Sequence, residues 1–275
     1  MKNLKTLSLC LTMVITVLFV GCSKDSDTNP GAPTLPPQSS IAPDMGNFSS
    51  NQENGAANLE GQDQSNFGFA ALNVIFWQSL LTVDLAIPVA AYKEAFNHSF
   101  EYLNDEDRWK SEYSVTVGDR NITATLYAEK VGASASWKMY LSSEGEFENF
   151  LWFSGTSRLD NTSGEWTLFK SPDEPRQLLS IDWENENDTE FKLTYNLVDT
   201  ESDKEGSYIE YGSTDEDVYT HFYDVSIVSK ADEDYDVSIL FNNNTKVGRV
   251  KSEAHFNSSD WFCWNESFQN QTCGS

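Results

Sequence analysis

From residue 108 to residue 250 the sequence is a series of short segments in which apolar and polar residues alternate. This pattern restricts the possible folds more than any other feature. Residues 113–117, 122–128, 137–141 and 191–197 are clear examples. Turns rich in Gly, Asn, Asp and Ser separate about ten or eleven such segments, as expected for β-strands. No long helical pattern lies between them, which excludes parallel crossover connections. We therefore predict a mainly β protein with an antiparallel meander.

A helical pattern precedes these segments, between residues 67 and 100. Leu72, Phe76, Leu80 and Val83 recur at helical spacing, and Pro88 should kink the helix or start a second one. A flat sheet of this size would leave long exposed edges, so we expect it to curl. The predicted fold is a strongly curved sheet, a half-barrel or open barrel, packed on this N-terminal α-helix. A sandwich of two sheets is the alternative.

The N-terminus has the features of an export signal. Lys2 and Lys5 precede an apolar run over residues 7–20, which is too short for a mature membrane span and fits a signal peptide over residues 1–21. Gly21 and Cys22 at its end resemble the bacterial lipobox, which implies that Cys22 is acylated and becomes the first mature residue. An ordinary signal peptide with an unrelated cysteine is the alternative.

Composition changes after Cys22. Residues 22–66 are rich in Ser, Asn, Pro and Gly and poor in aromatic residues, which favours extended chain that does not pack. We predict a disordered tether over residues 22–66 and a folded domain over residues 67–275. A loop that packs on the domain is the alternative for this segment.

Four cysteines are present, and two of them belong to the N-terminus. Cys10 leaves with the signal peptide and Cys22 carries the lipid. Outside the cytoplasm disulfides persist, so Cys263 and Cys273 are predicted to form one. Two thiols without further Cys or His ligands do not complete a tetrahedral metal site.

The chain is strongly acidic, with a formal net charge of −25. Such a surface repels phosphate backbones, so a nucleic-acid partner is not expected. Anionic lipid headgroups would be repelled as well, so membrane attachment should depend on the acyl chains. Acidic triplets such as residues 215–217 do not match the spacing of a calcium-binding loop; weak calcium coordination there is left as an alternative.

Catalytic motifs are not found. The sequence contains no Gly-x-Ser-x-Gly, no Ser-x-x-Lys and no His-Glu-x-x-His. His221, one of three histidines, lies within a strand pattern, where a structural role is commoner than a general base. We therefore predict a non-enzymatic protein without a cofactor.

Aromatic residues supply the most suggestive pattern. In several strands the second face also carries rings, so it should not be purely polar. Rings among Asp, Asn and Lys suit stacking on sugars, whereas an incompletely filled interior would let the same rings line a cavity for an acyl chain. Cover by loops or by a partner protein is a third interpretation. The candidate ligand-binding residues are Tyr127, Tyr140, Trp152, Phe169 and Tyr211.

Several stretches, residues 137–140, 150–155, 164–166, 248–251 and 261–264, together resemble an uncharacterised family of Bacteroidota lipoproteins. The resemblance covers most of the chain from Cys22 to Cys273 and implies an envelope location. Acidic residues directly after Cys22 resemble the signal that sends such lipoproteins to the outer face of the outer membrane, with the periplasmic face as the alternative. The order of helix and meander is also similar to that of periplasmic lipoprotein carriers and their outer-membrane receptor.

These observations together predict a non-enzymatic outer-membrane lipoprotein whose specific role they do not define, with a structural or a ligand- or glycan-binding surface module as the interpretation. The alternative is a carrier of a lipid or another hydrophobic ligand in a half-barrel cavity. Membrane attachment through the acyl chains is common to both, and an envelope protein partner is compatible with either.

Overall fold

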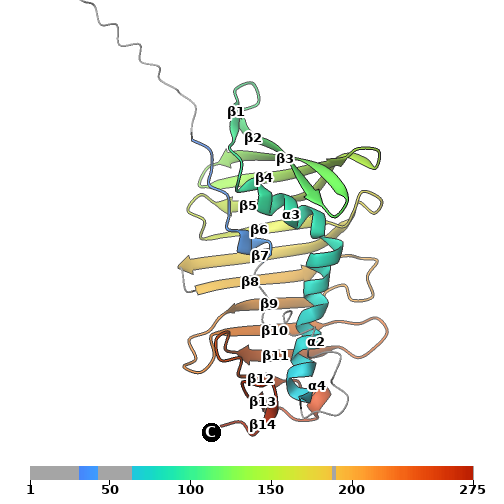
Figure 1. Cartoon of the computed structure of the whole chain (residues 1–275), viewed down its shortest axis with the longest axis vertical. Coiled ribbons are helices and arrows are strands. Elements are labelled where there is room, and N and C mark those ends of the chain that lie inside the picture. Colours follow the sequence, from blue (N-terminus) through green and yellow to red (C-terminus); the bar gives the residue numbers. More distant parts are fainter. Residues whose placement is uncertain (1–30, 43–63, 188–189, 275) are drawn as a thin grey trace, which may run out of the picture. The chain divides into compact units, whose positions relative to one another are not determined.

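One open antiparallel sheet contains fourteen strands of the described chain, and each strand pairs with its neighbours in the sequence (Figure 1). The computed structural model describes residues 31–42, 64–187 and 190–274. The predicted antiparallel meander is therefore confirmed, and the alternating segments correspond to β2 through β12. The strands are β1 (Glu101–Leu103), β2 (Arg108–Val117), β3 (Arg120–Val131), β4 (Ser134–Ser143), β5 (Phe147–Arg158), β6 (Ser163–Phe169), β7 (Gln177–Asn187), β8 (Glu190–Leu197), β9 (Tyr208–Ser213), β10 (His221–Ile227), β11 (Tyr235–Phe241), β12 (Gly248–Lys251), β13 (Phe262–Trp264) and β14 (Asn270–Gln271).

The predicted half-barrel is wrong, because this sheet is neither closed nor strongly curled. Two features remove the need for curling. The outermost strands, β1 and β14, have only three and two residues, so little unpaired backbone is exposed at either edge. The helices run along the direction in which the strands stack (Figure 1), so they cover the apolar face without the sheet having to wrap around them.

Two consecutive helices provide this cover. Helix α2 (Ser65–Ser79) continues into the π-helical turn η3 (Leu80–Asp84) and contacts β10 to β14. Helix α3 (Ala86–Ala95) contacts β2. The break falls at Leu85, whose N–H donates to the carbonyl of Leu80, five residues back, at 2.9 Å. Pro88 lies in the first turn of α3, where its missing N–H is not needed. The remaining helical elements of the described chain are two short turns, η1 (Gln38–Ser40) and α4 (Glu253–Phe256).

The two faces of the sheet differ sharply. On the face under the helices, here called the helix face, the side chains are buried; the other face, here called the open face, is polar. One register row of the helix face runs from Trp109 through Trp137, Trp166 and Tyr195 to Val237. The largest side chains that fill the space against the helices, all fully buried, include Trp77, Tyr92, Trp137, Trp166, Trp183, Tyr195 and Trp264.

Glycines opposite the indoles let the rings lie flat on the neighbouring strand. Gly248 is paired with Trp264, and a Cβ at Gly248 would lie 2.1 Å from Cζ2 of that indole. At Gly155, paired with Trp166, a Cβ would lie 2.4 Å from the ring. Because real atoms do not approach so closely, these positions are restricted to glycine.

Residues 32–42 pack on the helix face, which corrects the prediction of a non-packing tether for this part of residues 22–66. Ser40 and Ile41 are fully buried. The hydroxyl of Tyr92 donates to the carbonyl of Pro36 at 2.6 Å, and that of Tyr195 donates to the carbonyl of Ile41 at 2.7 Å. Burial raises the pKa of both tyrosines, so both hydroxyls remain donors at neutral pH. Residues 22–30 and 43–63 lie outside the described residues.

Composition predicted a non-packing tether because it does not show which hydrogen bonds a segment makes to the core. The indole of Trp166 donates to Oγ of Ser40 at 3.1 Å, and the amide of Asn161 donates to the carbonyl of Leu35 at 3.2 Å. The segment therefore satisfies polar groups of the core that would otherwise be buried without partners. It lies beside α3 in Figure 1, where it is drawn in blue.

The predicted disulfide is confirmed. Cys263 in β13 is bonded to Cys273, with 5.2 Å between their Cα atoms. The bond ties the chain after β14 back to β13 and so secures the C-terminal edge of the sheet.

Replacing Cys263 by Ser should lower the melting temperature without unfolding the domain at room temperature. Closing so short a loop contributes about 2–3 kcal/mol on the chain-entropy model, or about 5–10 °C in Tm for a domain of this size. Calorimetry in oxidising buffer measures the shift, and the double variant Cys263→Ser/Cys273→Ser controls for a free thiol. An unchanged Tm would contradict the stabilising role of the bond.

Replacing Gly248 by Ala should destabilise the fold, because the added methyl overlaps the ring of Trp264 and the carbonyl oxygen of Leu240. We expect a loss of about 1–3 kcal/mol in the free energy of unfolding, read from urea denaturation. Gly274→Ala is the matched control, since a Cβ there meets nothing within 4 Å. Equal stability of the two variants would exclude the proposed steric role of Gly248.

Candidate functional site

The open face of the sheet is the candidate binding surface. Strand alternation places a side chain there between two buried neighbours: Tyr127 stands between Leu126 and Ala128, and Arg249 stands between Gly248 and Val250. Most positions on this face carry small polar or charged residues, but rings gather at two places. We call them the C-terminal cluster (Glu216, Tyr219, Arg249 and Trp261) and the N-terminal cluster (Arg108, Tyr127 and Tyr140).

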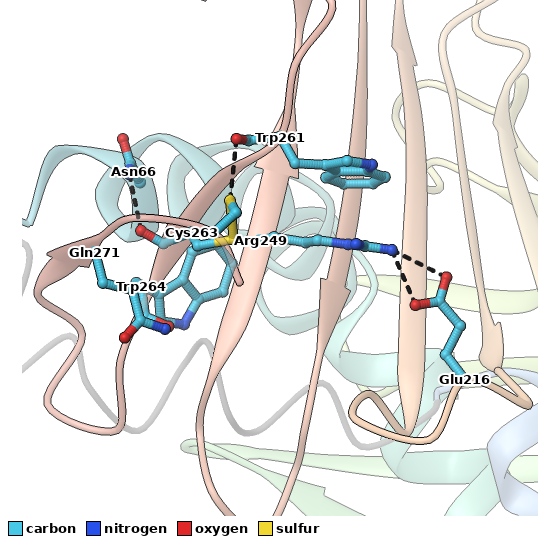
Figure 2. The surroundings of a disulfide bond; sticks show 8 residues. Asn66, Glu216, Arg249, Trp261, Cys263, Trp264 and Gln271 are labelled. Carbon is cyan, nitrogen blue, oxygen red and sulfur yellow. Dashed lines mark hydrogen bonds and ion pairs between the residues drawn. A yellow bond between two sulfur atoms is a disulfide. The ribbon is translucent and has the colours of Figure 1, made fainter. Parts of the chain in front are cut away.

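The C-terminal cluster is built around Arg249 of β12. Its guanidinium carbon lies 4.3 Å from the ring centre of Trp261 and 4.8 Å from that of Tyr219, so the cation is held by two aromatic rings. The same guanidinium donates to both carboxylate oxygens of Glu216, at 3.0 and 2.9 Å. Figure 2 shows the guanidinium parallel to the indole and directed at the carboxylate. Both rings remain half-exposed.

The disulfide fixes the segment that carries Trp261. Sγ of Cys273 lies 3.1 Å from the carbonyl oxygen of Trp261 (Figure 2). A disulfide sulfur has no hydrogen to donate, so this is a close contact and not a hydrogen bond. On the other side of the sheet the amide of Asn66 donates to the carbonyl of Cys263 at 2.9 Å. Helix α2 and the disulfide therefore hold the strand next to Trp261 from both sides.

The N-terminal cluster lies on β2, β3 and β4. The rings of Tyr127 and Tyr140 meet edge to face, with 6.0 Å between their centres. The guanidinium of Arg108 lies 3.8 Å from the ring centre of Tyr127. Tyr127 is paired in register with Lys110 of β2 and with Lys138 of β4. Arg108 and Lys110 are themselves paired with Glu106 and Glu112, so the cations beside these rings are largely neutralised.

Carboxylates occupy the open face between the two clusters. Glu165 faces Asp182 across β6 and β7, and Glu210 faces Asp224 across β9 and β10. Like charges directly opposite each other destabilise a sheet. Burial, with the charges of Glu165 and Glu184 as further causes, raises the pKa of Asp182. The surface is hollowed beside these residues, and both hollows have mainly polar linings.

The structure separates the five aromatic residues predicted as a ligand site. Tyr127 and Tyr140 lie together on the open face as expected. Trp152 is 3% exposed and Tyr211 is 7% exposed, so neither belongs to an exposed band. Phe169 is half-buried at the end of β6, where the register shifts. Trp152 was misplaced because a β-bulge between Met139 and Tyr140 changes the alternation in β5.

Tyr211 was misplaced because its face could not be read without the register. It stacks on Tyr223 at 4.8 Å and on His221 at 5.6 Å. Burial lowers the pKa of His221, and its ring is within hydrogen-bond distance of Thr220 and Asn243. Among the described residues no group of three or more His, Cys, Asp or Glu is arranged to hold a metal ion.

Sequence reasoning missed the C-terminal cluster. Residues 248–251 and 261–264 contributed to the family resemblance, but nothing in their spacing relates them to residues 216–219. Pairing of β12 with β13 and the hairpin between β9 and β10 bring the three segments together. A weak signal was present, because Arg249 and Lys251 alternate with buried residues and a tryptophan precedes the next strand.

Comparisons with known protein families, with curated proteins and with solved structures found no match for this chain.

Replacing Asp182 by Asn should raise the melting temperature at pH 7 by about 1–2 °C. The folded state raises the pKa of this carboxyl, so the ionised form costs stability at neutral pH, and the cost is relieved as pH falls through that pKa. The gain from Asn should therefore shrink toward pH 4. Thermal scans from pH 7 to pH 4 measure it, with Asp105→Asn in an exposed turn as the control. A gain independent of pH would contradict the electrostatic cause.

Proposed function

We propose that the protein is a non-enzymatic lipoprotein of the cell envelope, anchored through Cys22, that binds a glycan on the open face of its sheet. The C-terminal cluster is the proposed contact site. The placement at the cell surface rests on the signal-like N-terminus and on the acidic residues after Cys22. The disulfide agrees with an oxidising compartment.

The observation that carries the proposal is the combination of rings, a cation and a carboxylate in the C-terminal cluster. Tyr219 and Trp261 offer partly exposed rings, and the ion pair of Arg249 and Glu216 beside them offers fixed charged groups. Ligand sites combine apolar and aromatic surface with a few fixed polar groups. A sugar presents an apolar ring face and a rim of hydroxyls, so it matches both components.

The charge of the open face favours a neutral glycan. Acidic polysaccharides would be repelled by the carboxylates between the two clusters and by the net charge of −25. Hydroxyl groups of a neutral sugar, in contrast, can donate to those carboxylates. Shallow polar hollows beside Asp182 and Asp224 provide room for such contacts.

The alternative, a carrier of a hydrophobic ligand, has less support. Such a carrier needs unfilled apolar space between helix and sheet, whereas fully buried side chains such as Trp77, Trp166 and Trp183 occupy the described part of this space. Residues 32–42 add Ile41 to the same core. Native mass spectrometry before and after delipidation would support the carrier if an extra mass were present before the extraction and absent after it.

Trp261→Ala should weaken glycan binding at least about tenfold, because the variant loses the ring on which the sugar would stack. Affinity electrophoresis of the full protein in gels containing soluble glucans, xylans or mannans identifies the ligand, and titration of tryptophan fluorescence gives Kd. Arg249→Gln should weaken binding as well, because the donors and the cation are lost.

Phe96→Ala is the matched control, since Phe96 is an exposed ring on the helix side of the protein. Its binding should equal that of the wild type. Unchanged affinity of Trp261→Ala for a glycan that the wild type binds would move the site away from the C-terminal cluster. Failure of the wild type to bind any of the neutral polysaccharides would refute the proposal.

A further inference from the structure

The outward surface of α2 and η3 exposes two large apolar side chains that nothing in the described chain covers. Leu72 is 57% exposed and Val83 is 73% exposed. Phe76 and Leu80 lie at helical spacing between them and are partly exposed, whereas Phe69 stacks on His255 of α4, with 3.8 Å between the ring centres. Monomeric soluble proteins seldom expose a continuous apolar stripe of this kind without a function.

The helix also lacks charge in a highly charged protein. From residue 64 to residue 83 no Asp, Glu, Lys or Arg occurs, although the chain as a whole has a net charge of −25. Residues Ser65–Asp84 are long and apolar enough to cross a membrane, but half of this span is buried against the sheet. The helix is thus a core element whose other side would suit an apolar environment.

The position of residues 32–42 limits how far the helix face can move from the lipid anchor. These residues pack on the helix face beside α3 (Figure 1). Only ten residue steps separate Cys22 from Ala32, so the chain between them spans at most about 35 Å when fully extended. A tether over the whole of residues 22–66 would have allowed far more. The described chain therefore begins on the same face of the sheet that carries the helices.

We propose that the apolar stripe of α2 and η3 (Leu72, Phe76, Leu80 and Val83) rests in the surface of the lipid bilayer to which Cys22 is anchored. The inference rests on the acylation of Cys22 proposed above. The neutral stripe approaches headgroups without the repulsion that the acidic open face would meet, and its exposed side chains enter the boundary of the acyl region. The open face then points away from the membrane, toward the glycan.

Single cysteines carrying a fluorescent label test the contact in the full acylated protein. Cys22 is blocked by lipid and the other mature cysteines form the disulfide, so Leu72→Cys and Val83→Cys can be labelled selectively. Val218→Cys is the matched control, because Val218 is also 57% exposed but lies in the loop that carries Glu216 and Tyr219. The proteins are reconstituted into phosphatidylcholine vesicles that contain lipids with a quencher on the acyl chain.

We expect the lipid quencher to reduce the fluorescence of labels at 72 and 83 about twofold, while the label at 218 is unaffected. Equal, weak quenching at all three positions would overturn the inference. Labels at 72 and 83 that are shielded from water but not quenched by lipid would show that a protein covers the stripe, and would overturn it as well.

Mass spectrometry of the N-terminal peptide from the same preparation keeps the two proposals apart. An acylated Cys22 without quenching refutes only the bilayer contact. An unmodified Cys22 refutes the lipoprotein proposal, and quenching by added vesicles then still decides whether the stripe binds lipid.

Discussion

The indoles of Trp137, Trp166, Trp183 and Trp264 lie between the sheet and the helices, and the rest of the structure depends on their burial. Each large ring removes much apolar surface from water, so one face of the sheet supplies the core without help from a second sheet. Glycines opposite the rings let them lie flat, and helices running along the stacking direction cover them. The described residues can then form an open sheet of fourteen strands that does not close into a barrel.

One covered face leaves the other face free. Its small polar residues can hydrogen-bond to water, and burial together with the neighbouring carboxylates raises the pKa of Asp182. The two aromatic clusters interrupt this polar surface near its two ends. At the C-terminal end the disulfide and α2 hold the strand beside Trp261, so a feature of stability also fixes the geometry proposed for binding.

The two proposals give the faces different partners. The helix side exposes apolar side chains on the uncharged helix α2 and is close in sequence to the proposed lipid anchor, whereas the open side is acidic and carries rings with hydrogen-bonding groups. A single-layer sheet suits such a division, because strand alternation sends successive side chains to opposite faces. The bilayer would then be engaged by α2 and η3, which cover one face of the sheet, and the glycan by side chains on the opposite face.

Alternation along β2 to β12 determined the strands and their antiparallel order, because period-two patterning and short turns are local properties of the chain. The same holds for the helical stripe from Leu72 to Val83 and for the disulfide, which only two remaining cysteines could form. Curvature, the packing of residues 32–42 and the faces of Trp152 and Tyr211 were decided by tertiary structure. Each depends on contacts between distant segments: helices laid across strands, Trp166 bonded to Ser40, and a bulge that shifts the register by one residue. The C-terminal cluster likewise joins residues 216–219, 249 and 261, which only strand pairing brings together.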